Sequence, residues 1–179
     1  YRPPYTPTAI GAFAGRSRDK DFRPVRKTPS HIWAEEKGAV FVEVGMWMRA
    51  QWFPEKGETH WRQSVDREVL KTRKSVGVCD VTTLGKVDVQ GKDAASFLNL
   101  IYCNGFAKLA IGKTRYGLML REDGIALDDG TAARLDENHF VVTTTTANAV
   151  SVYRHMEFVR QCLYPKMDVQ LISTTEAWA

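Results

Sequence analysis

Two adjacent carboxylates, Asp128 and Asp129, stand in the stretch REDGIALDDGTAARL, which otherwise reads as two strands joined by a tight turn. Strands disfavour aspartate, and successive strand side chains point to opposite faces of a sheet. One carboxylate should therefore meet water, and the other should face inward, in a setting that suits proton transfer or the stabilisation of positive charge. We expect Asp128 on the solvent or turn side and Asp129 inward. A β-bulge whose two carboxylates bond local backbone amides, helped by Gly130, explains the pair equally well.

The other residue types that carry chemistry show no recognisable arrangement. The histidines and cysteines are scattered, at His31, His60, His139, His155, Cys79, Cys103 and Cys162. No His and Cys lie at a metal-ligand interval, so we expect no metal site, and we expect the three cysteines to be packing thiols in a reducing, intracellular setting. No nucleophile elbow is present. No glycine-rich phosphate loop opens a helix, so this stretch should not hold a dinucleotide.

A three-strand meander over residues 114–146 is expected to carry the carboxylate pair, with turn-forming residues at 122–124 and 136–138. Before it, KDAASFLNLIYC predicts a helix whose inward residues are Ala94, Phe97, Leu98 and Ile101. After it, residues 147–163 predict a helix with an apolar stripe of Ala149, Val152, Tyr153, Met156, Val159 and Leu163, and MDVQLIS predicts a last strand. Hairpin-linked strands with helices between them predict an α+β fold with a mainly antiparallel sheet.

Shorter elements are expected upstream. Thr28 can cap a short helix that runs to about Lys37, and AVFVEV then predicts a strand. GMWMRAQWFP predicts either a hydrophobic loop that packs on the core or on a neighbouring domain, or the wall of an aromatic ligand pocket. Residues 59–77 have helical spacing, with an apolar face of Trp61, Val65, Val69 and Leu70. VCDVTTLGKVDVQG reads as two short strands broken at Gly85.

The composition predicts one soluble globular domain preceded by an arm. The chain has 179 residues, 44% of them hydrophobic and 11% aromatic, which is enough for one core. Residues 1–29 hold five of the seven prolines and seven Lys or Arg against two Asp, so the basic net charge of +4 belongs to a linker or arm. No bilayer-spanning apolar run, signal peptide or RNA-binding motif is present, so we expect no membrane or nucleic-acid partner. The chain begins at Tyr1 and ends on TTEAWA, and we expect it to be a piece of a longer protein.

Residues 75–104 and 114–146 together resemble the first half of the tetrahydrofolate-binding aminomethyltransferase family, which has the fold of the glycine-cleavage T-protein. The shared pattern is a G-x-x-D-x-[ST] entry strand, an x-G-x-D-A-x-x-F-L helix and a Y-x-x-x-L-x-x-x-G-x-x-x-D-D hairpin, within a match from roughly Trp61 to Ser173. The composition indicates a Pro/Gly-rich basic arm over 1–29, and the resemblance implies the incomplete N-terminal part of a folate-binding domain over 30–179.

The resemblance also implies the residues of a site. The family's functional carboxylate falls on Asp129, whose implied role is to contact the pterin ring and to assist proton movement or charge stabilisation as a folate nitrogen attacks an iminium carbon. Tyr116 is implied as a pocket wall, and Leu84 as an apolar contact to the folate. Thr143 stands where the family has an asparagine, and Ala133 replaces a pterin-contacting tyrosine, which alters the detailed shape of the pocket.

Within the family, the segments YRPPYTP, GMWMRAQWF, ALDDGTAARL and TTTTANA resemble the alpha subunits of heterotetrameric sarcosine oxidases. That branch implies a cytoplasmic flavoenzyme in which a flavin oxidises sarcosine to an imine and oxygen is reduced to hydrogen peroxide. The one-carbon unit then passes to tetrahydrofolate, giving 5,10-methylenetetrahydrofolate and glycine, and formaldehyde is released when folate is absent. The implied partners are the beta, gamma and delta subunits and the rest of the alpha subunit, with FAD, FMN and NAD bound elsewhere in the complex.

Three other functions remain open at this point. The chain could be the folate domain of a dimethylglycine dehydrogenase-like enzyme, part of a free aminomethyltransferase, or a non-catalytic scaffold whose apolar segments hold subunits together. Because the second half of the folate domain lies beyond this chain, we expect the isolated chain to bind folate weakly or not at all and to have no oxidase activity.

Overall fold

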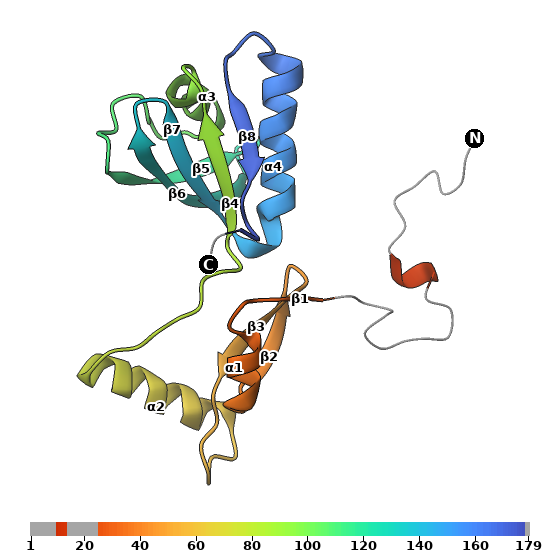
Figure 1. Cartoon of the computed structure of the whole chain (residues 1–179), viewed down its shortest axis with the longest axis vertical. Coiled ribbons are helices and arrows are strands. Elements are labelled where there is room, and N and C mark those ends of the chain that lie inside the picture. The colour runs from red at the N-terminus through yellow and green to blue at the C-terminus, as the bar shows by residue number, and fades with distance from the viewer. Residues whose placement is uncertain (1–9, 14–24, 178–179) are drawn as a thin grey trace. The chain divides into compact units, whose positions relative to one another are not determined.

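The computed structural model describes residues 10–13 and 25–177, and these fall in two compact units, Tyr1–Cys79 and Asp80–Ala179 (Figure 1). Most of the arm expected over 1–29 lies outside the described residues, and its division from a domain over 30–179 stays a prediction. None of the helices in the described ranges is long and apolar enough to cross a membrane.

The first unit contains a small three-stranded sheet with two α-helices. Its elements are η1 (Ile10–Phe13), β1 (Arg26–Lys27), α1 (His31–Glu36), β2 (Val40–Val44), β3 (Trp47–Trp52) and α2 (Trp61–Lys74). The strand order is β1-β3-β2, with β1 parallel and β2 antiparallel to β3. The helix expected from Thr28 begins at His31 after the N-cap Ser30, and the Thr28 and Ser30 hydroxyl oxygens lie 3.0 Å apart.

The segment GMWMRAQWFP contains a turn and strand β3, so the expected hydrophobic loop was wrong, while the aromatic pocket wall stays a prediction. Gly45 and Met46 form a two-residue turn with φ of 56° and 70°, and β3 returns from it along β2. Two positive φ angles are typical of the type I′ hairpin turn, where asparagine and glycine are usual. A methionine at the second position gave no turn signal, so the hairpin was missed.

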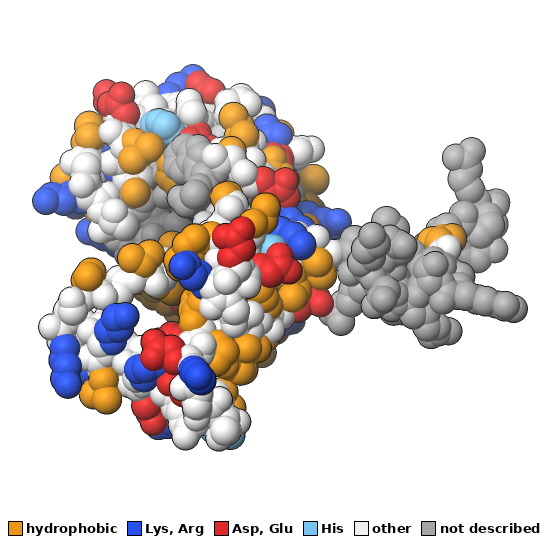
Figure 2. Space-filling model, turned by 60° about the horizontal axis from the view of Figure 1, so that its bottom comes forward, with side chains coloured by type: hydrophobic (Ala, Val, Ile, Leu, Met, Phe, Trp, Pro, Cys, Tyr) orange, Lys and Arg blue, Asp and Glu red, His pale blue; other side chains and the backbone are white. Residues whose placement is uncertain are grey.

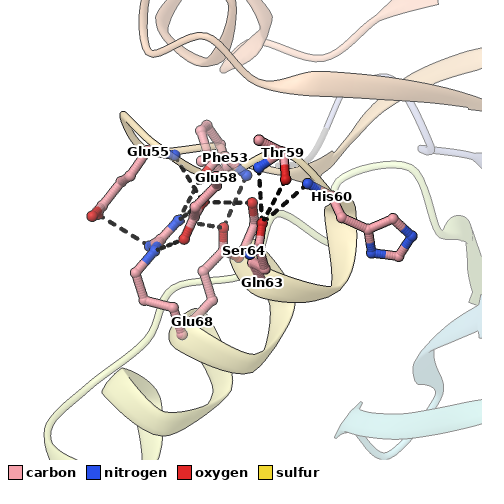
Figure 3. A network of polar contacts seen from close by, with 9 residues as sticks. Phe53, Glu55, Glu58, Thr59, His60, Gln63, Ser64 and Glu68 are labelled. Atoms are coloured by element: carbon pink, nitrogen blue, oxygen red, sulfur yellow. Dashed lines mark hydrogen bonds and ion pairs between the residues drawn. The ribbon is translucent and has the colours of Figure 1, made fainter.

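Helix α2 forms as predicted, but its expected apolar face is largely exposed within this unit. Trp61, Val69 and Leu70 are about half exposed, and the buried residue of the helix is Ser64. The side of the molecule drawn in Figure 2 shows hydrophobic side chains, in orange, at the surface among charged ones. Polar contacts with the preceding segment join α2 to the rest of this unit (Figure 3).

The second unit is a five-stranded sheet with its helices packed on one face (Figure 1). Its elements are β4 (Gly85–Gln90), α3 (Ala94–Ile101), β5 (Thr114–Leu120), β6 (Ala126–Asp136), β7 (His139–Thr144), η2 (Thr146–Asn148), α4 (Ala149–Phe158), η3 (Val159–Leu163) and β8 (Gln170–Ser173). The strand order is β5-β6-β7-β4-β8 and every neighbouring pair is antiparallel, so the predicted α+β class and the meander are confirmed.

The core of this unit lies between the sheet and helices α3 and α4. All four residues predicted to face inward from α3 are buried, and Phe97 and Leu98 are fully so. The stripe on α4 is buried at Val152, Met156 and Val159, but Leu163 is exposed. Residues 159–163 form a π-helical turn, whose wider spacing rotates Leu163 away from the stripe that an α-helical period predicts.

Two further expectations were wrong. The segment VCDVTTLGKVDVQG contains one strand, β4, which begins at Gly85. Residues 78–81 before it are irregular and residues 82–84 form a turn, so the first of the two expected strands is not there. The three cysteines expected to pack are all exposed.

Candidate functional site

The two adjacent carboxylates of β6 point to opposite faces of the sheet, but in the reverse of the predicted order. The side chain of Asp128 is buried, with 6% of its surface exposed, whereas Asp129 is exposed on the face away from α3 and α4. The expectation that Asp129 faces inward was therefore wrong. The expectation that the two carboxylates point to opposite faces was right.

A β-bulge at the start of β6 explains the reversal. Met119 pairs with Asp128 and Leu120 pairs with Ala126, which leaves Leu127 as an extra residue in the ladder. Because a bulge interrupts the alternation, Leu127 packs against the core and Asp128 also points inward. Strict alternation from Leu127, which is all that the sequence offers, therefore assigns both carboxylates to the wrong face of the sheet.

Asp129 and Tyr116 are in direct contact. Strand β5 places Leu118 opposite Asp129 and Tyr116 opposite Thr131, so the tyrosine reaches the carboxylate diagonally across the two strands. The Tyr116 hydroxyl donates a hydrogen bond to Asp129 Oδ2, and 57% of Tyr116 is exposed. The result is a phenol–carboxylate pair that a ligand can approach from solvent.

Thr143 lies on the same face of the sheet as this pair. Its hydroxyl oxygen accepts a hydrogen bond from the Thr131 backbone N–H at 2.9 Å and lies 2.9 Å from the Thr131 hydroxyl oxygen. The intervening Gly130 lets β6 and β7 approach closely, since a Cβ at this position would overlap the Thr143 carbonyl oxygen. Gly130 thus fixes the spacing between the strands that carry Asp129 and Thr143.

Leu84 is held by different contacts. It lies in the turn before β4, where its carbonyl oxygen accepts a hydrogen bond from Lys86 Nζ at 3.2 Å, and the Thr82 carbonyl accepts another at 2.7 Å. Burial lowers the pKa of Lys86, and the negative charge of Asp80 opposes that shift. The structure brings Tyr116, Asp129 and Thr143 to one face and places Leu84 at the entry to β4.

The buried Asp128 accepts two hydrogen bonds that the sequence did not predict. Its Oδ2 accepts from the Thr145 backbone N–H at 3.0 Å, and its Oδ1 accepts from Asn148 Nδ2 at 3.2 Å. Burial and, to a smaller extent, the Asp128 charge raise the pKa of the Tyr102 hydroxyl. The polar run TTTTANA directly before a helix was the one sequence signal for such an arrangement.

A separate polar cluster of this unit is centred on Asp88. Asp88 and His139 make a 2.7 Å contact, and Gln90 Nε2 donates to the same carboxylate at 2.6 Å. His139 begins β7, whereas Thr143 lies near its other end. Among the residues that the structure describes, no group of three or more His, Cys, Asp or Glu is placed to hold a metal ion.

A surface pocket of this unit contains none of the predicted site residues. It is lined by Asp93 and residues 163–167.

The chain is similar to known proteins along its whole length. The GCVT N-terminal domain model matches residues 30–179. The chain is 57% identical over all 179 residues to sarcosine oxidase subunit alpha of Rhizobium meliloti (strain 1021) and 46% identical to that of Corynebacterium sp. (strain P-1), and it spans 18% of the length of each. It is also 32% identical over 126 residues to an aminomethyltransferase of Corynebacterium aurimucosum, covering 70% of this chain and 32% of that protein.

A solved structure supports the fold. The crystal structure of glycine cleavage system aminomethyltransferase T from Bartonella henselae matches with a TM-score of 0.69 and 24% identity, over 83% of this chain and 38% of that chain. These matches confirm the predicted resemblance to the aminomethyltransferases and to sarcosine oxidase alpha subunits.

Proposed function

Because this chain belongs to the GCVT N-terminal domain family, we propose that it supplies part of a tetrahydrofolate site at which a one-carbon unit is transferred to the folate. The observation that carries the proposal is the exposed Asp129 carboxylate with the Tyr116 hydroxyl donating to it. In this proposal residues 1–29 form a basic arm, and residues 30–179 form the N-terminal, incomplete part of the folate-binding domain.

The residues present fit one side of a folate. A carboxylate open to solvent accepts hydrogen bonds from ring N–H groups, and the Tyr116 ring offers a flat apolar surface beside it. Leu84 would supply an apolar contact, and Thr143 a hydroxyl in the place of the family's asparagine. Each of these roles is part of the proposal.

The chemistry needs a proton carrier. A folate nitrogen loses its proton as it bonds to the one-carbon unit, and the departing amine nitrogen gains one as its own bond to that carbon breaks. A positioned carboxylate can hold the first proton and stabilise the positive charge of the iminium carbon beforehand. Asp129 would do both, with Tyr116 fixing the direction of its oxygen atoms.

For the longer protein, the proposal extends to sarcosine as the source of the one-carbon unit, because the 57% identical relative is a sarcosine oxidase subunit alpha. A flavin elsewhere in the complex would oxidise sarcosine and reduce oxygen to hydrogen peroxide, and the transfer would yield 5,10-methylenetetrahydrofolate and glycine. FAD, FMN and NAD would be bound outside this chain. The remaining alpha chain and the beta, gamma and delta subunits would be the partners, in the cytoplasm.

Replacing Asp129→Asn in the complete enzyme assembly tests the proposal. The rate of 5,10-methylenetetrahydrofolate formation should fall about a hundredfold, since a positioned proton carrier contributes roughly 10²–10⁴. Sarcosine oxidation should remain, with formaldehyde as the product. Asp136→Asn, an exposed aspartate on the same strand, is the matched control. An unchanged methylenetetrahydrofolate yield in Asp129→Asn would favour the scaffold function instead.

A further inference from the structure

We propose that Asp128, the buried neighbour of Asp129, is a positioning residue that holds the Leu84 turn in place through the chain segment between β7 and α4. The proposal rests on the proposed function, because it concerns how two residues of the folate site are kept in register. It assigns Asp128 no contact with folate.

The first step is the attachment of this segment to β6. Asp128 binds the backbone N–H of Thr145, which precedes η2, and the side chain of Asn148, which ends it. Asn148 Nδ2 also donates to the Leu127 carbonyl oxygen at 3.2 Å. Both ends of the single turn η2 are therefore fastened to the strand that carries Asp129.

The second step is the attachment of the Leu84 turn to the same segment. The Thr83 and Thr146 hydroxyl oxygens lie 3.1 Å apart, and only 1% and 5% of these two residues are exposed. A Cβ at Gly85 would overlap Thr144 Oγ1 and lie 2.6 Å from Ala149 Cβ, so the start of β4 has no free space against this segment. A displacement of η2 must therefore move the residues next to Leu84.

The third step concerns what Asp128→Asn would change. The asparagine oxygen can still accept one hydrogen bond, but its NH₂ group would face the NH₂ group of Asn148, and two donors cannot bond each other. One charge-assisted hydrogen bond is lost while the volume is kept. Lys86 still binds the Thr82 and Leu84 carbonyl oxygens, so the turn should shift without unfolding.

The experiment measures 5,10-methylenetetrahydrofolate formation by the complete assembly at varied tetrahydrofolate concentration. For Asp128→Asn we expect the KM for tetrahydrofolate to rise about tenfold, the effect of roughly one hydrogen bond to a charged group. The maximal rate at saturating folate should stay within about twofold, because Asp129 and Tyr116 keep their own contact. Thr83→Val, which removes the buried hydroxyl pair and leaves Asp128 intact, should raise the same KM in the same direction.

The outcomes separate this proposal from the proposed function. A structural role alone would lower the amount of folded enzyme and reduce the maximal rate, with KM unchanged, and would overturn the positioning role. An unchanged KM in Thr83→Val would also overturn it, even if Asp128→Asn fails to assemble. If Asp129→Asn slows transfer as proposed while Asp128→Asn and Thr83→Val behave as the native enzyme, only the positioning role fails. If Asp129→Asn has no effect, the folate site itself is wrong.

Discussion

Gly130 is the residue whose size most constrains the candidate site. It follows Asp129 in β6, and a Cβ at this position would overlap the Thr143 carbonyl oxygen of the neighbouring strand β7. Any side chain there would separate the two strands or rotate the β6 backbone, and the carboxylate next to it would move as well.

Gly130→Ala should therefore destabilise the chain by about 1–3 kcal/mol, the usual cost of inserting a methyl group into a filled space. The expected loss in melting temperature is several degrees, measured by calorimetry. Gly105→Ala is the matched control, because a Cβ at Gly105 would meet no atom within 4 Å. Equal melting temperatures for the two variants would contradict the close approach at Thr143.

The carboxylate pair shows what a sequence can and cannot predict at this scale. Its presence at a strand, and the division into one buried and one exposed side chain, follow from composition and alternation. Which carboxylate is buried depends on the bulge at Leu127, and that is set by pairing with Met119 and Leu120 on another strand. The residues around the pair do not reveal this pairing with the neighbouring strand, so the buried and the exposed carboxylate were predicted the wrong way round.

At the scale of elements, Glu58 joins helix α2 to the segment that precedes it (Figure 3). Arg67 Nε donates to Glu58 Oε1 at 2.7 Å, and Ser64 Oγ donates to Oε2 at 2.6 Å. Arg67 also binds the Phe53 carbonyl oxygen at 2.7 Å. The hydrogen bonds that Glu58 accepts from Arg67, and to a smaller extent from Ser64 and the Glu55 backbone N–H, lower the pKa of Glu58 to about 2.

The lowered pKa predicts a pH dependence with a definite sign. A carboxyl group whose pKa is lower in the folded chain stabilises the fold above its unfolded value of 4.5, and that stabilisation is lost as pH falls from 4.5 towards 2. Glu58→Gln should be less stable than the native chain at pH 7, with the difference shrinking by pH 3. Urea unfolding midpoints at both pH values measure this. Glu36→Gln, on the exposed end of α1, is the control, and a difference that grows on acidification would contradict the network.

Elements with a clear period were predictable, and those that depend on another segment were not. Helix α3 was predicted with all its buried residues because four apolar positions follow the helical repeat in eight residues. Strand β3 was missed because the turn that joins it to β2 contains Met46, a residue that is unusual at a positive φ. The exposure of the apolar face of α2 was not predicted. The helix is joined to the preceding segment by Glu58, Arg67 and Ser64, and polar contacts of this kind leave no apolar repeat in the sequence.

At the scale of the whole molecule, the proposed folate site would be formed only in part by this chain. Ligand sites commonly enclose about 70–90% of a small ligand's surface. The chain spans 18% of the length of its sarcosine oxidase relatives, and its matched family model is described as an N-terminal domain. The open sheet face with Asp129 and Tyr116 would cover a folate on one side only.

The isolated chain should therefore show no micromolar affinity for tetrahydrofolate. Calorimetric titration measures this directly, with the complete assembly as the positive control. A dissociation constant near 1 µM, which corresponds to about −8.2 kcal/mol, would mean that this chain alone closes the site. That result would contradict the predicted need for a second half.

The bulge at Leu127 has a consequence for how this hairpin tolerates insertions and deletions. The bulge accommodates one extra residue between the turn at 121–125 and the rest of β6. The length of the turn therefore does not by itself decide which side chains of β6 face the core. The facing of these side chains is set further along β6, by the close approach of Gly130 to Thr143 and by the hydrogen bond between Asp128 and Thr145. Adding or removing one residue in the turn should therefore leave Asp129 facing the same side of the sheet.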